Sequence, residues 1–272
     1  VLMAEGLALI SGVMKVVTLT NGDFIVLGGL LAFSQFSNYA MTPLVAFPLV
    51  ALLLFVIGLI VQRGMLERIT AAGPEGELRT LLATFGLSYV VSNASFLLWG
   101  SQFQSIPFLQ GSIQIGPIAV PEGLAASSLI AFGVALLVHA WLTATIMGKS
   151  VHATAQSGLG AASAGLNIRK IRALAFALGS AMAGGAGALV ITLIPFQTST
   201  GGDLTVQAFT LIALGGLGNY LGAWLAAELL GLTEVFTQYY FGSNAASAVI
   251  YVVFIGVLVF RPQGLLGKVG RV

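Results

Sequence analysis

The sequence contains no cysteine, and charged residues make up only 7% of its 272 residues. Without cysteine there is no disulfide framework, no thiolate metal ligand and no cysteine nucleophile. A soluble domain carries about a quarter charged residues because its surface must face water. Apolar residues here make up 57% of the chain, and its mean hydropathy is +1.00. The composition therefore predicts a protein whose outer surface faces lipid.

Apolar stretches of membrane-crossing length recur along the chain, since a spanning helix needs about 20 such residues. The 35 glycines are also typical of membrane helices that pack through small residues. We therefore predict an all-α, polytopic transmembrane helical bundle of eight or nine segments, forming a single domain over 1–272. Val1 already lies in an apolar stretch, so the first helix is expected to be incomplete at its N-terminus. The expected segments are 2–19, 23–37, 43–61, 80–99, 122–147, 171–195, 205–218, 221–237 and 245–260.

The basic residues predict the orientation of the bundle. Ten of the 11 Lys and Arg residues fall in three segments, and the intervening loops at 100–121, 196–204 and 238–244 contain none. Cytoplasmic loops carry an excess of Lys and Arg, so we predict that the basic segments and the C-terminus are cytoplasmic and that 100–121 lies outside. The basic segments contain Arg63, Arg68 and Arg79; Lys149, Arg169, Lys170 and Arg172; and Arg261, Lys268 and Arg271.

The external stretch 103–121 holds three prolines, two glycines and a short alternating run. This pattern predicts a folded extracytoplasmic cap, for which a β-hairpin is one possible form, and not a flexible linker.

A few polar residues within predicted spans are candidates for a transport role. Asp23 lies at the break between the first two segments, beside Asn21 and Gly22. A carboxylate there could cap the following helix and meet its positive dipole end, or it could line a substrate path. Glu228 and Glu234 are six residues apart and point in different directions around a helix, so they do not form a carboxylate pair.

The run from Leu214 to Gly222 places small residues three and four positions apart. That spacing suits close helix packing, and together with Asn219 it also suits a broken helix that lines a cavity. Segment 24–29 resembles segment 209–216, and glycine-interrupted pairs of this kind occur in the internal repeats of transporters; chance similarity is the alternative. The candidate pathway residues are Asn21, Gly22, Asp23, Gly215, Gly216, Gly218 and Asn219.

No catalytic site is predicted. Gly148-Lys149-Ser150 resembles the end of a phosphate-binding loop, but that motif requires a glycine at 143, where this chain has threonine, and a preceding strand. His139 and His152 lack a matched carboxylate pair, so a packed histidine is the favoured interpretation of His139 and no metal site is expected. Any ATP must be hydrolysed by another polypeptide.

The cytoplasmic segment 148–172 is rich in Ala, Gly and Ser, and it is too polar to cross the membrane. It is long enough for one or two short helices. A solvated linker is one interpretation, and a surface that docks on a partner protein is the other.

Residues 148–187 resemble the cytoplasmic-loop signature of the LivH/LivM-type ABC permeases for branched-chain amino acids. Three further blocks are similar to that family in the same order: 20–24, then 214–222 followed by Glu234, and 260–267. The resemblance implies a non-enzymatic permease subunit of an ABC importer. Its expected solute is a branched-chain or related small amino acid, or a small amide or acid, that crosses the inner membrane.

The resemblance also implies partners. Segment 148–172 would seat in a groove of a separate ATP-binding subunit, a second homologous or identical permease would complete the pathway, and an extracytoplasmic solute-binding protein would dock on the outer loops. ATP and Mg²⁺ would belong to the ATPase subunits, with no cofactor or nucleic acid bound by this chain. The implied coupling residues are Gly148, Lys149, His152, Ala155, Ala161, Gly165, Leu166 and Asn167.

Two departures from the family pattern leave the substrate open. The family has Arg at the position of His152 and Asp or Asn near Ser157, and its 20–24 block contains a His that is absent here. The main rival is an ion-coupled secondary transporter, for which Asp23, Glu228 and Glu234 would be the ion-coupling acids. A passive channel and a purely structural membrane protein are further alternatives.

Overall fold

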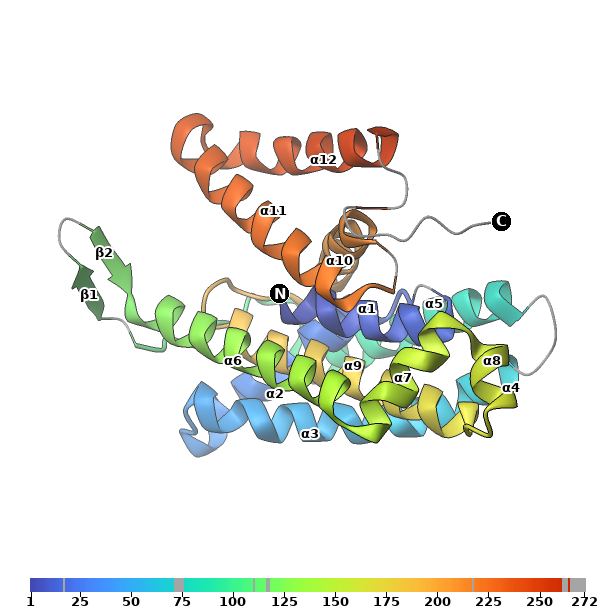
Figure 1. The fold of residues 1–272 in the computed structure, drawn as a ribbon. Helices are drawn as coiled ribbons and strands as arrows, with labels where there is room; N and C mark the ends of the chain where they lie inside the picture. The colour runs from blue at the N-terminus through green and yellow to red at the C-terminus, as the bar shows by residue number, and fades with distance from the viewer. Residues whose placement is uncertain are drawn as a thin grey trace.

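The structure is a computed structural model that describes the chain except residues 17, 71–75, 110, 116–117, 217, 261–263 and 265–272. It is an all-α bundle with one small antiparallel hairpin, as predicted (Figure 1). The elements are α1 (Leu2–Met14), α2 (Asn21–Tyr39), α3 (Pro43–Val61), a π-helical turn (Gln62–Leu66), α4 (Glu67–Thr70), α5 (Gly76–Trp99), β1 (Ser112–Ile115), β2 (Ile118–Pro121), α6 (Glu122–Ala144), α7 (Ile146–Gln156), α8 (Gly158–Ser163), α9 (Ile168–Val190), a 3₁₀ turn (Thr198–Thr200), α10 (Gly201–Gly215), α11 (Tyr220–Phe241) and α12 (Ser243–Phe260).

Helix α9 forms the centre of the bundle, with α1, α2 and α3 packed along it. In its most apolar stretch of 18 residues, 78% of the residues are buried, compared with 11–22% in the other membrane-length helices. Small residues allow this close approach. A Cβ atom on Gly28 of α2 would overlap the backbone of Gly184, and one on Gly187 would overlap the carbonyl oxygen of Ile25. The Ala/Gly-rich sequence of α9 thus lets neighbouring helix backbones come into contact.

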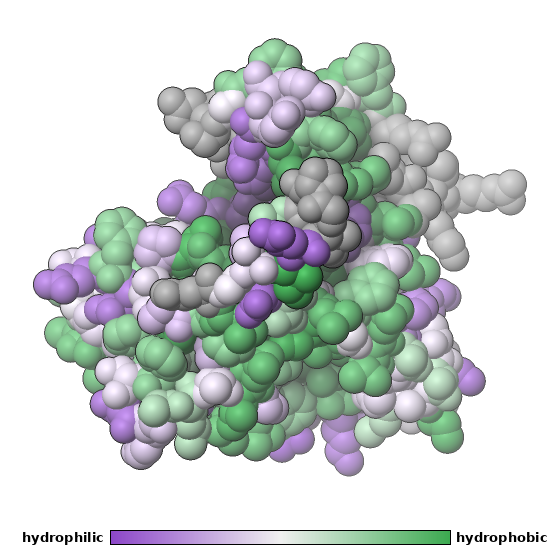
Figure 2. Space-filling view, turned by 90° about the vertical axis from the view of Figure 1, so that its left-hand side faces the viewer, coloured by the Kyte–Doolittle hydropathy of each residue, from purple (hydrophilic) through white to green (hydrophobic). Residues whose placement is uncertain are grey.

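Helices lie at each of the predicted membrane segments. In the described part of the chain, four of them are long and apolar enough to cross a bilayer: Pro43–Ile69, Leu78–Trp99, α6 and α9. The 3₁₀ turn with α10, together with α11, makes a fifth candidate if this pair, bent by 114°, is one broken span. Figure 2 shows hydrophobic residues over much of one outer face, with hydrophilic residues gathered in the recess between the upper helices and the body.

The two ends of the bundle differ in structure. The β1–β2 hairpin lies at one end, while α4 and α8 lie at the opposite end (Figure 1). The hairpin pairs Ser112 with Pro121 and Ile115 with Ile118, which confirms the hairpin predicted within 103–121. Backbone hydrogen bonds of 2.8 Å in both directions between Gln104 and Phe196 tie this loop to the segment that follows α9.

Several predicted helix boundaries were wrong for local reasons. The first helix ends at Met14, and not at 19, because Lys15 adopts a left-handed conformation with φ 60°. The fifth ends at Ala144, and not at 147, because Thr145 is extended and its Oγ1 accepts the Gly148 N–H at 3.0 Å to start α7. The sixth ends at Val190 and not at 195. Apart from Phe260 and Gly264, the C-terminal block 260–267 lies outside the described residues.

Candidate transport pathway and coupling surface

The break between α1 and α2 is a buried junction with the start of α10. The Gly22 N–H donates to Thr205 Oγ1 at 2.9 Å, and the same hydroxyl lies 3.1 Å from the carbonyl oxygen of Leu19. A Cβ atom on Gly22 would overlap the carbonyl oxygen of Gly201. One discontinuity in the bundle therefore packs directly on the beginning of another helix, and glycine is required for that contact.

Asp23 joins this junction to α5. Its side chain is buried, and its carboxylate accepts a hydrogen bond from the Ser88 hydroxyl. A Cβ atom on Gly201 would contact the Asp23 carboxylate, so the acid also abuts α10. No side-chain capping bond forms at the start of α2. Asp23 itself lies in the first turn of α2, where a carboxylate meets the positive end of the helix dipole, and it also links neighbouring helices.

Asn21 is the polar residue of this junction with the least satisfied side chain. It is 1% exposed, and neither its Nδ2 nor its Oδ1 atom has a hydrogen-bond partner within the described structure. The nearby Thr18 hydroxyl is also buried without a partner there. Each unpaired buried polar group costs roughly 1–3 kcal/mol. Such a cost is typical of a functional position, and it keeps Asn21 a candidate for the pathway.

The glycines of the 214–222 run are consistent with both interpretations of the sequence, close helix packing and a broken helix. Gly215 packs against the backbone of Gly222, and Gly218 packs against Gly12 of α1. Gly216 adopts φ 100°, a conformation that favours glycine, at the break before α11. Asn219 Oδ1 accepts the Gly222 N–H at 3.1 Å and caps α11. The run therefore produces close helix packing and a sharp break at once.

The predicted coupling segment consists of the two short helices α7 and α8, followed by the start of α9. Several of its residues face the bundle. Gly148 lies against the backbone of Trp141 and Leu142, and Ala161 is buried. Ala155 and Leu166 pack against a buried cluster formed by Leu9, Val13, Val151, Ile171 and Ala175. These residues hold the segment on the end of the bundle.

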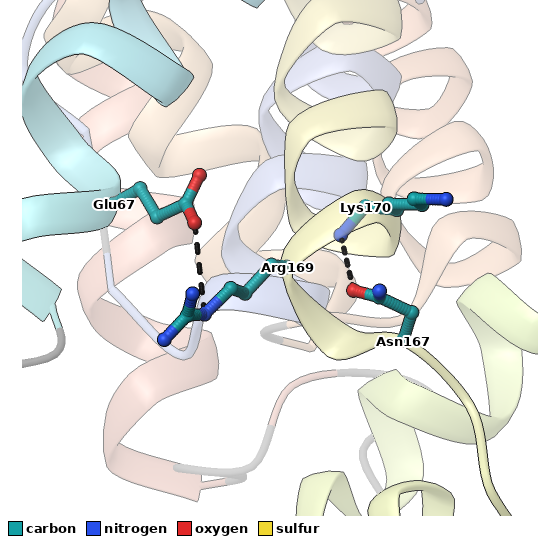
Figure 3. A network of polar contacts seen from close by, with 4 residues as sticks. All are labelled: Glu67, Asn167, Arg169 and Lys170. Carbon is teal, nitrogen blue, oxygen red and sulfur yellow. Dashed lines mark hydrogen bonds and ion pairs between the residues drawn. The ribbon is translucent and has the colours of Figure 1, made fainter.

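The remaining coupling residues face outward: Lys149, His152, Gly165 and Asn167 are exposed. Asn167 Oδ1 accepts the Lys170 N–H at 3.1 Å and caps α9 (Figure 3). Arg169 Nε lies 3.6 Å from Glu67 Oε1 of α4. This ion pair brings two of the three basic segments to the same end of the bundle.

A cavity of about 420 Å³ connects the coupling segment with the broken helix pair. Its wall includes Lys149 and His152 of α7, Asn219 at the start of α11, and His139 of α6. The structure thus brings residues of the predicted coupling and pathway groups to one cavity. The junction residues Asn21, Gly22 and Asp23 belong to a separate region around the starts of α2 and α10.

A smaller cavity of about 140 Å³ adjoins the first, because both are lined by His139, Tyr220 and Leu221. Glu5 of α1 also lines it, and this side chain is 1% exposed. Sequence reasoning named Asp23, Glu228 and Glu234 as the intramembrane acids and overlooked Glu5. A single glutamate inside the apolar stretch 2–14 was the available signal, since an ionisable residue in a span is a functional candidate by default.

The described helices, their exposed apolar faces and the cavities at the broken pair define a polytopic membrane protein. The profile of the family described as "branched-chain amino acid transport system / permease component" matches residues 1–258, and the chain belongs to this family of transport permeases.

Curated proteins that are similar to this chain include three transport permeases. It is 30% identical to the high-affinity branched-chain amino acid transport system permease protein BraD of Pseudomonas aeruginosa, over 98% of this chain and 91% of BraD. It is 24% identical to the corresponding LivH protein of Salmonella typhimurium, with the same shares. It is 31% identical to the autoinducer 2 import system permease protein LsrC of Salmonella paratyphi B, over 57% of this chain and 46% of LsrC. No solved structure matches the chain.

Proposed function

We propose that this chain is the membrane-spanning permease subunit of an ABC importer. Its solute is a branched-chain amino acid or a related small amino acid, amide or acid, moved inward across the inner membrane. The observation that carries the proposal is the family match over 1–258, joined to a helical coupling segment packed on one end of the bundle. ATP and Mg²⁺ are bound by partner subunits, and this chain supplies no cofactor.

The outer face of 148–172 is the proposed docking surface for the ATPase subunit. Lys149 and His152 are exposed on α7, and Leu159 on α8 has 88% of its surface exposed. Leu159 supplies the apolar contact of this surface, whereas Lys149 and His152 line the cavity between α7 and the broken helix pair. Ala155, Ala161 and Leu166 contribute by fixing the segment to the bundle, so that a push from the ATPase reaches α1 and α9.

The second permease is proposed to cover the exposed side of α11. Glu228 is exposed on that helix, and a charged side chain facing lipid is costly. That face therefore meets protein or a water-filled path. We assign the pathway to this side of a single permease domain, 1–272, of eight or nine membrane segments, lined by the broken α10–α11 pair with Gly215, Gly216, Gly218 and Asn219. The separate buried junction of Asn21, Gly22 and Asp23 is proposed as a second part of the pathway.

The hairpin end is proposed as the outer face. A solute-binding protein docks there, and the basic segments with the C-terminus are cytoplasmic. Exposed Phe103 and Ile113 give this end an apolar contact surface. The Gln104–Phe196 bridge ties the surface to the end of α9, so that docking of the binding protein is transmitted to the central helix.

An ion-coupled secondary transporter is the second candidate, and buried Glu5 and Asp23 are the observations that favour it. Co-purification separates the two functions. The chain should be expressed from its native locus with an affinity tag and purified in mild detergent. An ATP-binding subunit recovered in a defined ratio supports the importer, whereas a chain that transports an ion-linked solute without any such subunit overturns it.

A further inference from the structure

We propose that Glu5, His139, Tyr220 and Trp224 form a subsite that binds the ammonium group of the transported solute, on the side of the pathway nearest the coupling segment. This inference rests on the proposed function and adds to it the chemistry of the solute. Three helices build the subsite: α1 supplies the acid, α6 the imidazole, and α11 the phenol and the indole.

The carboxylate of Glu5 is the charged group of the subsite. It lines the cavity of about 140 Å³ and is 1% exposed. One oxygen, Oε2, is buried without a hydrogen-bond partner in the described structure. The Tyr220 hydroxyl lies 3.3 Å from the carbonyl oxygen of Ala135, which fixes its position. The Glu5 Oε2 oxygen is buried beside the cavity and unpaired, so a donor that reaches it would remove the cost of leaving a buried acceptor unsatisfied.

The walls around this oxygen suit a monovalent nitrogen cation. His139 stacks on Tyr220 with ring centroids 6.1 Å apart and planes 17° apart. Trp224 lies on the same wall, and its ring centroid is 5.9 Å from that of Phe132. Aromatic faces attract ammonium groups by 0.5 to roughly 2 kcal/mol. Ca²⁺ or Mg²⁺ would require about six oxygen ligands, and the residues that line the cavity offer far fewer.

An acidic side chain in one cavity and basic side chains in the adjoining cavity suit a zwitterionic solute. The inner cavity contains the acid Glu5. The outer cavity, of about 420 Å³, is lined by Lys149 and His152 at the coupling segment. Because the cavities share His139 and Tyr220, a small amino acid could place its ammonium group at Glu5 and direct its carboxylate toward the basic side chains. The inner volume fits the ammonium end alone, and the outer one accommodates the rest of the solute.

The proposal can be tested by ligand stabilisation of the purified complex, with L-leucine and its deaminated analogue 4-methylpentanoate as probes. L-leucine is expected to raise the melting temperature of the wild-type complex, and 4-methylpentanoate to raise it much less. Glu5→Gln should weaken the L-leucine effect by about 10–100-fold in concentration, the equivalent of one charge-assisted hydrogen bond. Glu122→Gln is the matched control, because it makes the same change at a half-buried acid at the start of α6 that lines neither cavity, and it should retain the wild-type response.

Tyr220→Phe keeps the ring and removes the hydroxyl, so it covers the case in which Glu5→Gln fails to fold; it should weaken the L-leucine response by a smaller factor. An unchanged L-leucine response in both variants overturns the subsite. ATP-dependent uptake separates this failure from that of the proposed function. A wild-type complex that imports only ammonium-free solutes such as acetamide overturns the subsite and leaves the importer intact. A complex without ATP-dependent uptake overturns both.

Discussion

The Ser88 hydroxyl donates a hydrogen bond to the Asp23 carboxylate, and this bond joins α5 to the first turn of α2 at the buried break between α1 and α2. The two residues are 65 positions apart in sequence. On its other side the carboxylate abuts Gly201, the first residue of α10. A single acid thus connects three helices at a point where the chain is discontinuous.

Removing the Ser88 hydroxyl should therefore destabilise the fold. Ser88→Ala leaves the buried carboxylate without this hydrogen bond, and we expect a loss of about 1–3 kcal/mol. Thermal unfolding of the detergent-purified chain measures it. Ser92→Ala is the control one turn along α5, because the Ser92 hydroxyl makes only a 3.4 Å contact with the Thr198 carbonyl oxygen. Equal melting temperatures for the two variants would contradict the proposed link.

The glycine contacts of α2 and α9 predict a second stability difference. Gly28→Ala places a methyl group into the backbone of Gly184, and overpacking of this kind costs about 1–3 kcal/mol. Gly86→Ala in α5 is the matched control, because no neighbouring atom lies within 4 Å of its added Cβ. The same unfolding assay should show a lower melting temperature for Gly28→Ala only; a wild-type value would show that the two helices are not in close contact.

The absence of native cysteine makes the orientation directly testable. Ser112→Cys on the hairpin and Ser163→Cys on α8 are both exposed, at opposite ends of the bundle. In intact spheroplasts a membrane-impermeant maleimide should label the first variant, and it should label the second only after lysis. Labelling in the reverse order would invert the proposed topology. The unsubstituted chain gives the background, which should be zero.

Leu159→Asp tests the docking surface. Leu159 is 88% exposed on α8, so the substitution should not unfold the chain. A buried charge at the interface should reduce ATP-driven uptake at least tenfold and weaken retention of the ATPase subunit on co-purification. Ile113→Asp on the hairpin is the control, since Ile113 is also exposed but lies at the other end. It should retain the ATPase and lose stimulation by the binding protein. Unchanged coupling in Leu159→Asp would exclude α8 from the interface.

Much of the fold was predictable because hydropathy and helix-end residues act locally. Helix α3 begins at Pro43 as predicted, since proline favours the first turn, and its α-helical part ends at Val61, where a π-helical turn continues the span to Ile69. The hairpin was predictable from its alternating run. The early end of α1 was not, because a left-handed lysine at position 15 has no sequence signal comparable to glycine.

The candidate site was less predictable because it depends on contacts between distant helices. Pattern alone predicted the 148–172 segment and the break at Asn21–Asp23 as candidate sites. The cavity shared by His139, Tyr220 and Glu5 is formed by α6, α11 and α1, and no local pattern relates these three residues. His139 was taken as a packed histidine, and its stacking on Tyr220 agrees with that interpretation. The same stacking also places it in the cavity wall.

The central claim is that ATP hydrolysis by a partner subunit drives solute through this chain. The most direct measurement is uptake of radiolabelled L-leucine into liposomes that contain the purified complex and enclose an ATP-regenerating system. The binding protein is supplied outside. Uptake that requires ATP and stops with a hydrolysis-deficient ATPase subunit is the expected result. Uptake that proceeds without ATP and follows an imposed proton or sodium gradient would contradict the account.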